Sequence, residues 1–368
     1  MTARALKTIF NSFFVIINVL VVTLFVMAAF SDRIAPETSL FFSYLGMGFP
    51  ILFLINICFL LWWLLMGEWR FLLISLISFA ICWFPLTNYF PFHGRVNPVP
   101  EENTIKVLTY NVMGFAYKNH TEEAPNEIVR YITESGADIV CLQEYVVHSS
   151  DKYLTAKTLN KALSMYPYRS IIKLKSSPHQ VWGLAVYSKY PISGSKRIPY
   201  DSMSNGSSIH EVNVNGKKIT LINNHLESFK LTMEDKNRYA DFLKNAGSET
   251  FDNLKGTIQQ KLGPAFIKRA EQARLVAEEI EKTGNEYILV CGDFNDTPIS
   301  YAHHTIQGPL LDAFSESGRG FGITYNENFF WFRIDHILYS SNMKAMNCTV
   351  DKVKYSDHYP VWCYLEME

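Results

Sequence analysis

Three long uncharged apolar runs near the amino terminus constrain this chain more than any other feature of its sequence. They cover residues 9–30, 40–66 and 71–90, and none of them contains Asp, Glu, Lys or Arg. About 20 apolar residues in a helix suffice to cross the roughly 30 Å hydrocarbon core of a bilayer. We therefore predict three transmembrane helices within a membrane region that covers residues 1–92.

Arg4 and Lys7 precede the first run, as the basic region of a cleaved signal peptide would. The length of this run and the presence of two further runs favour a retained anchor instead. The few basic residues beside the runs favour a cytoplasmic amino terminus by the positive-inside rule. Three spans then make this a multi-pass integral membrane protein and place its remaining residues in the periplasm or outside the cell.

The composition changes after the third run. Residues 93–103 are polar and contain two prolines, as linkers do, so we expect a second domain over residues 104–368. Four of the 34 basic and three of the 35 acidic side chains precede residue 91, which leaves 30 basic and 32 acidic side chains for the remainder. Proteins that bind long nucleic acid without sequence preference carry a basic surplus, so this balance counts against such a substrate.

Short apolar segments rich in β-branched residues recur through the second domain, with turn-forming residues between them. Asn215 and Gly216 predict a tight hairpin between two of these segments. So many strands with so few helices between them indicate two packed sheets flanked by helices, and not a regular alternation of strands and helices.

The segment 226–286 interrupts the strand pattern because it is polar and rich in helix formers. It predicts helices over residues 232–245, 251–262 and 264–282. The last of these has a proline at its start and apolar residues at helical spacing, which indicates a helix that covers a sheet. The aromatic and apolar residues of the earlier part make it a candidate lid or membrane-facing element.

Polar side chains follow the apolar segments of the second domain. In VCGDFNDTP, Asp293 and Asn295 stand two residues apart, so both side chains can point the same way from the end of a strand. Taken alone, such residues also make ordinary turns. The same pattern recurs in TYN with Asn111, LQE with Glu144, NNH with His225, RIDHI with Asp335, and SDHYP with Asp357 and His358. Carboxylate and amide oxygens suit Mg²⁺ or Mn²⁺, and a neighbouring histidine can act as an acid or base near neutral pH.

The ordered series LTYN, LQE, GDFN, RIDHI and SDHYP resembles the endonuclease/exonuclease/phosphatase superfamily, whose fold is that of deoxyribonuclease I. The resemblance covers about residues 104–366. It implies a four-layer α/β sandwich, in which two mainly antiparallel sheets pack together between helices and deliver the site at one end. It also implies a hydrolase that cleaves phosphoesters with a divalent metal ion, Mg²⁺ or alternatively Mn²⁺.

The resemblance further implies which residues bind the metal ion and the phosphate. Glu144 would be the principal metal ligand, and Asn111 and Asp357 would complete or support the metal site. Asp293 and Asn295 would orient the attacking water and bind the phosphate, or hold a second metal.

Two histidines complete the set that the resemblance implies. His358 would contact the phosphate as a base or charge stabiliser, and Asp335 would fix its tautomer by hydrogen bonding. His225 would protonate the leaving oxygen. Deoxyribonuclease-like members pair this last histidine with a carboxylate from an intervening loop, and this sequence offers only Glu227 close by along the chain.

The sequence therefore predicts a membrane-anchored, divalent-metal-dependent phosphoester hydrolase whose site faces outside the cytoplasm. It would be a phosphodiesterase, a nuclease or a phosphatase, and its substrate a phospholipid head group, a small phosphate ester or nucleic acid. A catalytically silent member of the same fold that binds a lipid or a partner is the alternative, although a binding module would not need the whole polar set. The lipid bilayer is a partner through the three apolar runs, and the sequence leaves the oligomeric state open.

Overall fold

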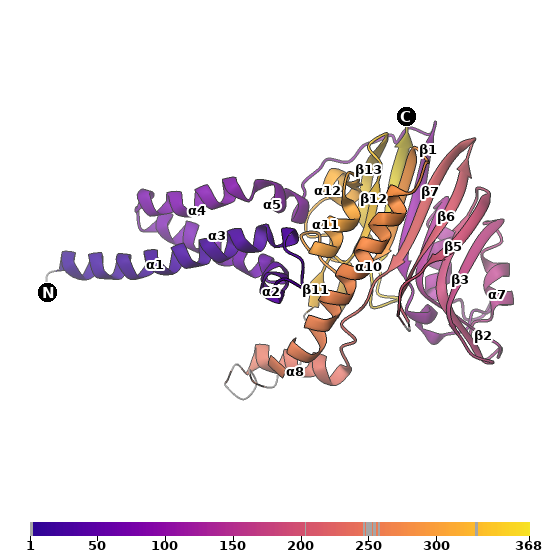
Figure 1. The fold of residues 1–368 in the computed structure, drawn as a ribbon, viewed down its shortest axis with the longest axis horizontal. Coiled ribbons are helices and arrows are strands. Elements are labelled where there is room, and N and C mark those ends of the chain that lie inside the picture. The colour runs from indigo at the N-terminus through magenta and orange to yellow at the C-terminus, as the bar shows by residue number, and fades with distance from the viewer. Residues whose placement is uncertain are drawn as a thin grey trace.

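The computed structural model describes residues 3–368 apart from 203, 246, 248–251, 253–254, 257 and 328–329. A bundle of apolar helices extends from one side of a domain built around two β-sheets (Figure 1). The amino-terminal end of the chain lies at the far end of the bundle, and the carboxy terminus lies where the strands of the sheets end (Figure 1).

The apolar runs form the helices of the bundle. These elements are α1 (Ala3–Ala29), η1 (Ser31–Arg33), α2 (Leu40–Met47), α3 (Phe49–Leu65), α4 (Trp69–Ile81) and α5 (Trp83–Tyr89). Among the described residues, α1 is the one helix long and apolar enough to cross a membrane by itself. A 60° bend separates α2 from α3, and a 67° bend separates α4 from α5. The prediction of three transmembrane helices therefore depends on counting each bent pair as one span.

A proline begins the helix that follows each bend. Pro50 lies in the first turn of α3, and Pro85 lies in the first turn of α5. The first N–H groups of a helix have no partner within it, so a proline, which lacks this group, is tolerated there but not in a helix interior. The two prolines thus favour the start of a new helix over the continuation of the old one.

Two six-stranded sheets form the centre of the second domain. The first has the strand order β13–β14–β1–β2–β4–β3, and the second has the order β5–β6–β7–β8–β12–β9. Each sheet is mixed, because β1 is parallel to β2 and β7 is parallel to β8, whereas the other neighbours are antiparallel. The strands are β1 (Thr104–Asn111), β2 (Ile139–His148), β3 (Tyr168–Ser176), β4 (Gln180–Ser188), β5 (Ile192–Ile198), β6 (Gly206–Val214), β7 (Lys217–His225), β8 (Tyr287–Asp293), β9 (Leu311–Asp312), β12 (Asp335–Tyr339), β13 (Met343–Val350) and β14 (Val361–Met367).

Helices cover the outer faces of both sheets (Figure 1). The remaining elements are η2 (Met113–Tyr117), α6 (Glu127–Glu134), α7 (Ala156–Ala162), α8 (Met233–Lys244), η3 (Ile258–Leu262), α10 (Gly263–Glu281), α11 (Tyr301–Gln307), α12 (Ala313–Ser317) and the strand pair β10 (Tyr325–Glu327) and β11 (Phe330–Phe332).

Buried apolar clusters separate the layers of the domain. Val107 of β1 and Leu289 of β8 belong to the cluster between the two sheets. Ile132 of α6 packs in a second cluster on the outer face of the first sheet, and Val276 of α10 packs in a third on the outer face of the second sheet. The predicted α/β sandwich of two sheets flanked by helices is therefore confirmed, with one parallel strand pair in each sheet.

The turn and the helices that we predict for the second domain can each be compared with the structure. Asn215 and Gly216 form the turn between β6 and β7, as predicted. The helices predicted over residues 232–245 and 264–282 correspond to α8 and α10. Residues 251, 253–254 and 257 of the helix predicted over residues 251–262 lie outside the described part of the chain, and the end of this segment forms the π-helix η3.

The bundle packs directly against the sheet domain. A Cβ atom added at Gly46 would lie 2.2 Å from Ser31 Oγ, so α2 packs on η1 with no room for a side chain. Ser31 Oγ also lies 3.4 Å from the carbonyl oxygen of Ile299, a residue of the sheet domain whose side chain is buried among bundle residues. The rings of Tyr44 in α2 and Phe266 in α10 lie 5.6 Å apart. These contacts fix α2 relative to the sheets.

The predicted linker, residues 93–103, lies along the domain instead of spanning a gap. The backbone N–H of His93 donates to the carbonyl oxygen of Gly318 at 3.1 Å. Val96 exchanges two hydrogen bonds with the side chain of Asn347, both 2.9 Å long. The second domain is thus attached to the bundle by packing as well as by the chain.

Buried His210 of β6 makes the stability of the domain depend on pH. Its ring nitrogens lie 2.9 Å from Ser195 Oγ and 2.8 Å from Ser208 Oγ, and burial lowers its pKa from 6.5 to about 4. Between about pH 4 and pH 6.5, His210 therefore binds a proton in the unfolded chain but not in the folded protein. The stability that neutral His210 contributes is therefore complete above pH 6.5 and is lost as the pH falls towards 4.

We expect His210→Asn to reduce the fall in Tm between pH 7.5 and pH 5, since the variant has no proton to take up at this site. The free energy involved is about 3 kcal/mol at most. Thermal unfolding of the full chain in detergent measures the effect, and His179→Asn, on an exposed loop, is the matched control. An equally steep fall in wild type and His210→Asn would contradict the prediction.

Candidate active site

The carboxyl ends of the two parallel strand pairs meet at one end of the sandwich. β1 ends at Asn111 beside β2, which carries Glu144. β7 ends at His225 beside β8, which ends at Asp293. Loops and strand ends at such an edge supply side chains without breaking the buried core, which is why ligand sites are common there.

Asn111 connects the two sheets at this edge. Its Nδ2 donates to Glu144 Oε1 at 3.2 Å and to Asp293 Oδ2 at 3.0 Å. Its Oδ1 accepts from the backbone N–H of Met113 at 3.1 Å. A buried amide with both sides engaged is held in one orientation, so Asn111 sets the spacing between the two carboxylates.

Glu144 owes its direction to a β-bulge. The pairing of β2 with β4 shifts register between Leu142 and Tyr145, and Glu144 has a φ of +49°. A bulge takes one residue out of the alternating pattern of a strand and re-aims its side chain. Positive φ is uncommon in residues other than glycine and is found preferentially at functional sites. The bulge lets Glu144 line the cavity while its neighbours stay buried.

Three neighbouring strands align the other site residues. His225 lies opposite Asp293 in the β7–β8 pair, and Asp335 lies opposite Asp293 in the β8–β12 pair. His358 comes from the segment between β13 and β14, and its Nδ1 lies 2.8 Å from Asp335 Oδ2. The Nε2 atoms of His358 and His225 lie 3.6 Å and 3.7 Å from Asp293 Oδ2.

These groups shift one another's pKa. Burial opposes the charge of His358, but the Asp335 and Asp293 carboxylates outweigh it and raise the pKa of His358 well above its ordinary value. Burial raises the pKa of Asp293 to about 6, and His358 partly offsets this increase. Burial, followed by repulsion from Asp357, also raises the pKa of Glu144. Burial and the neighbouring Asp357 thus disfavour the charged form of Glu144, although His358 partly offsets both effects.

A tight turn after β8 positions Asn295. A Cβ atom added at Gly292, whose φ is +134°, would lie 2.0 Å from the carbonyl oxygen of Asn224, so the two strands approach closely only with glycine here. The backbone N–H of Asn295 donates to Asp293 Oδ1 at 2.8 Å, and its Nδ2 donates to the carbonyl oxygen of Leu226 at 2.9 Å. Asn295 thus holds both the turn and the Asp293 carboxylate in place.

One cavity of about 240 Å³ gathers the predicted site. Six of the eight predicted residues line it, namely Glu144, His225, Asp293, Asn295, Asp357 and His358. The other two, Asn111 and Asp335, hydrogen-bond to lining residues. The structure therefore brings all eight together, while the role of each stays a prediction.

Sequence reasoning missed several residues of the cavity. Lys236 of α8 lines it, with its Nζ 3.0 Å from Glu327 and 5.4 Å from the centre of the Tyr325 ring. Met47, the last residue of α2, also lines it although it belongs to the membrane region. No motif marks a lysine in a helix or a methionine in an apolar run, so only the folded chain identifies these residues.

The close contacts of the Glu227 carboxylate are with residues other than His225, although its charge contributes to raising the pKa of His225 against the effect of burial. Its carboxylate forms an ion pair with Lys230, accepts from Ser202 Oγ at 2.8 Å and lies 3.6 Å from Lys268 Nζ. His225 instead has the Glu144 and Asp293 carboxylates within 3.7 Å. The carboxylate expected from an intervening loop is thus replaced by carboxylates of the site itself.

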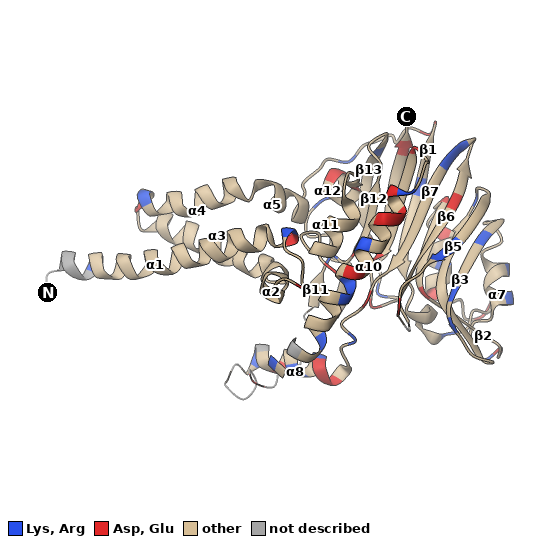
Figure 2. Cartoon of the chain, in the orientation of Figure 1, with Lys and Arg blue, Asp and Glu red and all other residues tan. Residues whose placement is uncertain are grey.

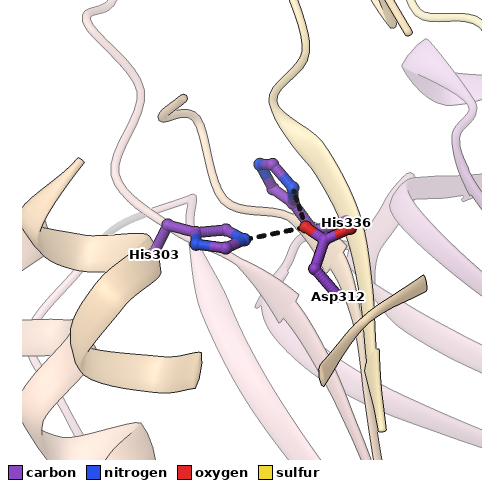
Figure 3. Close-up of side chains that lie close together, drawn as sticks. All are labelled: His303, Asp312 and His336. Atoms are coloured by element: carbon purple, nitrogen blue, oxygen red, sulfur yellow. Dashed lines mark hydrogen bonds and ion pairs between the residues drawn. The ribbon is translucent and has the colours of Figure 1, made fainter. Parts of the chain in front are cut away.

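A second buried cluster lies outside the cavity lining and supports β12. Asp312 Oδ2 lies 3.0 Å from His303 Nε2 and 3.5 Å from His336 Nδ1 (Figure 3). Arg333 lies 3.8 Å from Asp312 Oδ1, and although burial opposes the charge, this guanidinium and the histidines hold the pKa of Asp312 well below its ordinary value. We interpret the cluster as an ion-paired network that anchors the start of β12, where Asp335 lies.

The residues around Glu144 fit a divalent cation. Glu144 and Asp357 supply carboxylate oxygens, and a cation beside them would offset the burial and the mutual repulsion that raise the pKa of Glu144. Ligand atoms of Asp293, Asp335 and His358 also lie within 4.8 Å of one another, but Asp335 and His358 are hydrogen-bonded to each other. The group around Glu144 is therefore the better candidate for a metal centre.

Two protein-family models match the chain, one over each of its two parts. The model of the endonuclease/exonuclease/phosphatase family matches residues 108–358, a range that contains all eight predicted site residues. A second model, described as a domain of unknown function (DUF8431), matches residues 11–89. No curated protein matches the chain.

Solved structures also resemble this one. The human nocturnin catalytic domain with bound sulfate anion is 18% identical, with a TM-score of 0.49 over 73% of this chain and 97% of that one. The endonuclease/exonuclease/phosphatase of Bacteroides vulgatus is 18% identical, with a TM-score of 0.48 over 73% and 100%. Humanized D. rerio TDP2 is 14% identical, with a TM-score of 0.48 over 72% and 99%.

We expect the pKa of His358 to fall in Asp335→Asn, because the variant lacks the carboxylate that raises it and leaves burial less opposed. A ¹³C-histidine NMR titration of the full chain in detergent, without added metal, measures the pKa, and His358→Gln assigns the signal. Asp138→Asn, which removes a carboxylate 2.9 Å from Lys189, should leave that pKa unchanged. An unaltered titration in Asp335→Asn would show that this hydrogen bond does not control His358.

Proposed function

The chain belongs to the endonuclease/exonuclease/phosphatase family, and we propose that it is a membrane-anchored, divalent-metal-dependent hydrolase of phosphoester bonds with its site outside the cytoplasm. The family generally acts hydrolytically on phosphoesters. The observation that carries the proposal is the convergence of four carboxylates, two histidines and two asparagines from distant segments on a single cavity.

We assign the metal to Glu144, with Asn111 and Asp357 as further or supporting ligands. Mg²⁺ is the proposed ion and Mn²⁺ the alternative, because both prefer oxygen donors and accept phosphate oxygens as ligands. When bound, the ion would polarise the phosphoryl group and offset the negative charge that grows as the ester is cleaved in line.

The chain's own residues position the reacting groups. Because Asp335 engages Nδ1 of His358, the Nε2 of His358 is left to face Asp293 and the cavity, where a phosphate oxygen would lie. Asp293 and Asn295 border the same space and would hold the attacking water. His225, on the other side of Asp293, would deliver the proton to the leaving oxygen.

Exposed apolar side chains support the membrane anchor. Leu65 is 81% exposed and Phe84 is 78% exposed, and both lie on helices of the bundle. Such a surface is unfavourable in water but suits hydrocarbon. We propose that α1 and the two bent helix pairs each cross the bilayer, with the amino terminus in the cytoplasm.

We expect Glu144→Gln to lower kcat for bis(p-nitrophenyl) phosphate or p-nitrophenyl phosphate by about 10²- to 10³-fold, because it removes the charge that would hold the metal. Release of p-nitrophenol by the purified full chain with Mg²⁺ measures this. Glu123→Gln, on an exposed loop, should match wild type. No turnover by wild type on any phosphoester would favour the catalytically silent alternative.

We expect chelation to abolish hydrolysis and Mg²⁺ to restore it, since the proposed ion would polarise the phosphoryl group, which the histidines of the site do not do. The measurement is the initial rate with EDTA, followed by titration with Mg²⁺ or Mn²⁺. Full activity in excess EDTA would rule out the metal-dependent mechanism.

A further inference from the structure

The cavity that holds the site is polar on part of its lining and apolar on the rest. Beside the carboxylates and histidines, its lining includes Met47, Phe229, Leu231, Phe330, Phe332 and Ile334. A phosphate and a metal need the polar part, but neither needs a large aromatic and aliphatic surface beside it. Apolar lining of this extent is typical of a site that also binds the hydrocarbon part of its ligand.

The membrane region itself contributes to this apolar lining. Met47 ends α2 at the 60° bend before α3, so the interruption of the second apolar run lies at the cavity. The packing of Gly46 on Ser31, and of Tyr44 on Phe266, holds this end of α2 in place. The site is therefore completed by a helix of the membrane region, not merely tethered near it.

Exposed apolar side chains also lie on α2, which contributes Met47 to the cavity, and on α8, which contributes Lys236. Phe41 on α2 is 51% exposed, and Met233 at the start of α8 is 60% exposed. α8 extends from the domain towards the side on which the bundle lies (Figure 1). A ligand that arrives from a bilayer around the bundle would thus meet apolar surface before it reached the polar end of the cavity.

The size and charge of the cavity suit one phosphate group more than a polymer. A volume of about 240 Å³ accommodates a head group. Its two lysines, Lys230 and Lys236, are both paired with glutamates. In the view of Figure 2, described Lys and Arg of the domain are interspersed with Asp and Glu along the visible elements, whereas the backbone of a nucleic acid favours a basic surface.

We propose that the substrate is a membrane lipid with a phosphoester head group, whose phosphate binds at the Glu144 and His358 end of the cavity while its hydrocarbon chain lies against Met47, Phe229 and Leu231. This inference rests on the proposed hydrolase function. In the reaction, the oxygen of water bonds to phosphorus, the ester P–O bond breaks, and the leaving oxygen takes a proton. The alcohol and phosphate products therefore separate between the membrane and water.

The test compares lipids with their water-soluble counterparts on the purified full chain in nanodiscs with Mg²⁺. The lipid probes are phosphatidylcholine vesicles, alone or with phosphatidate or phosphatidylglycerol. The soluble probes are glycerol 3-phosphate, glycerophosphocholine and glycerophosphoglycerol. We expect at least one lipid to exceed its soluble counterpart in kcat/KM by about tenfold or more, because burial of several CH₂ groups contributes to its binding.

Two variants on different elements test the apolar wall. Met47→Gln and Leu231→Gln should each raise KM for the lipid by about tenfold, with a smaller effect on kcat and on the soluble ester. Met165→Gln, an exposed methionine between α7 and β3, is the matched control and should change neither. The Tm of each variant identifies any loss of folding, and the second variant keeps the test valid if the first fails to fold.

The outcomes separate the two proposals. Hydrolysis of no phosphoester at all would overturn the proposed function. Hydrolysis of soluble esters with no preference for lipids, or an equal effect of Met47→Gln and Leu231→Gln on lipid and soluble esters, would overturn the lipid inference and leave the hydrolase intact. Cleavage of a DNA oligonucleotide in preference to every lipid would do the same.

Discussion

The side-chain amide of Asn111 joins the two sheets at the point where both of them end. It donates to Glu144 of the first sheet and to Asp293 of the second, so a single side chain fixes the positions of two carboxylates that repel each other. A further polar link lies beneath it, where Gln143 Nε2 donates to Asn223 Oδ1 at 2.7 Å across the same interface. Apolar packing holds the sheets together, but hydrogen bonds with defined directions set their relative position. The geometry of the cavity depends on these contacts.

Glu144, at this end of the sandwich, combines a strained backbone conformation with repulsion from a neighbouring carboxylate. Its bulge and positive φ are less favourable than a regular strand, and its burial beside Asp357 disfavours its charge. The buried apolar residues on the two faces of the first sheet hold this conformation in place. An arrangement of this kind is stabilised when a cation binds, so the same features that weaken the free protein favour a metal centre.

The helical bundle contributes to the cavity of the candidate site and is not only connected to it by the chain. Its second apolar run bends where α2 meets the sheet domain, and the contact of Gly46 with Ser31 brings Met47 to the cavity. A rigid attachment also keeps the cavity at one distance from the bilayer, which a flexible linker would not do. On the proposed function, a near-neutral domain would select its phosphoester by the surface from which the substrate arrives and by the apolar group that the substrate carries.

The sequence by itself determined what local patterns can encode: the apolar runs, the alternation that makes two sheets, and the polar residues that end strands, from Asn111 to His358. These follow from neighbours along the chain, and the sandwich confirmed the pattern. Only the tertiary structure decided the bends within two apolar runs, the engagement of Glu227 by Lys230 instead of His225, and the place of Met47 in the cavity. Such features depend on which distant segments pack together, because a side chain acquires its partners from the fold and not from its position in the chain.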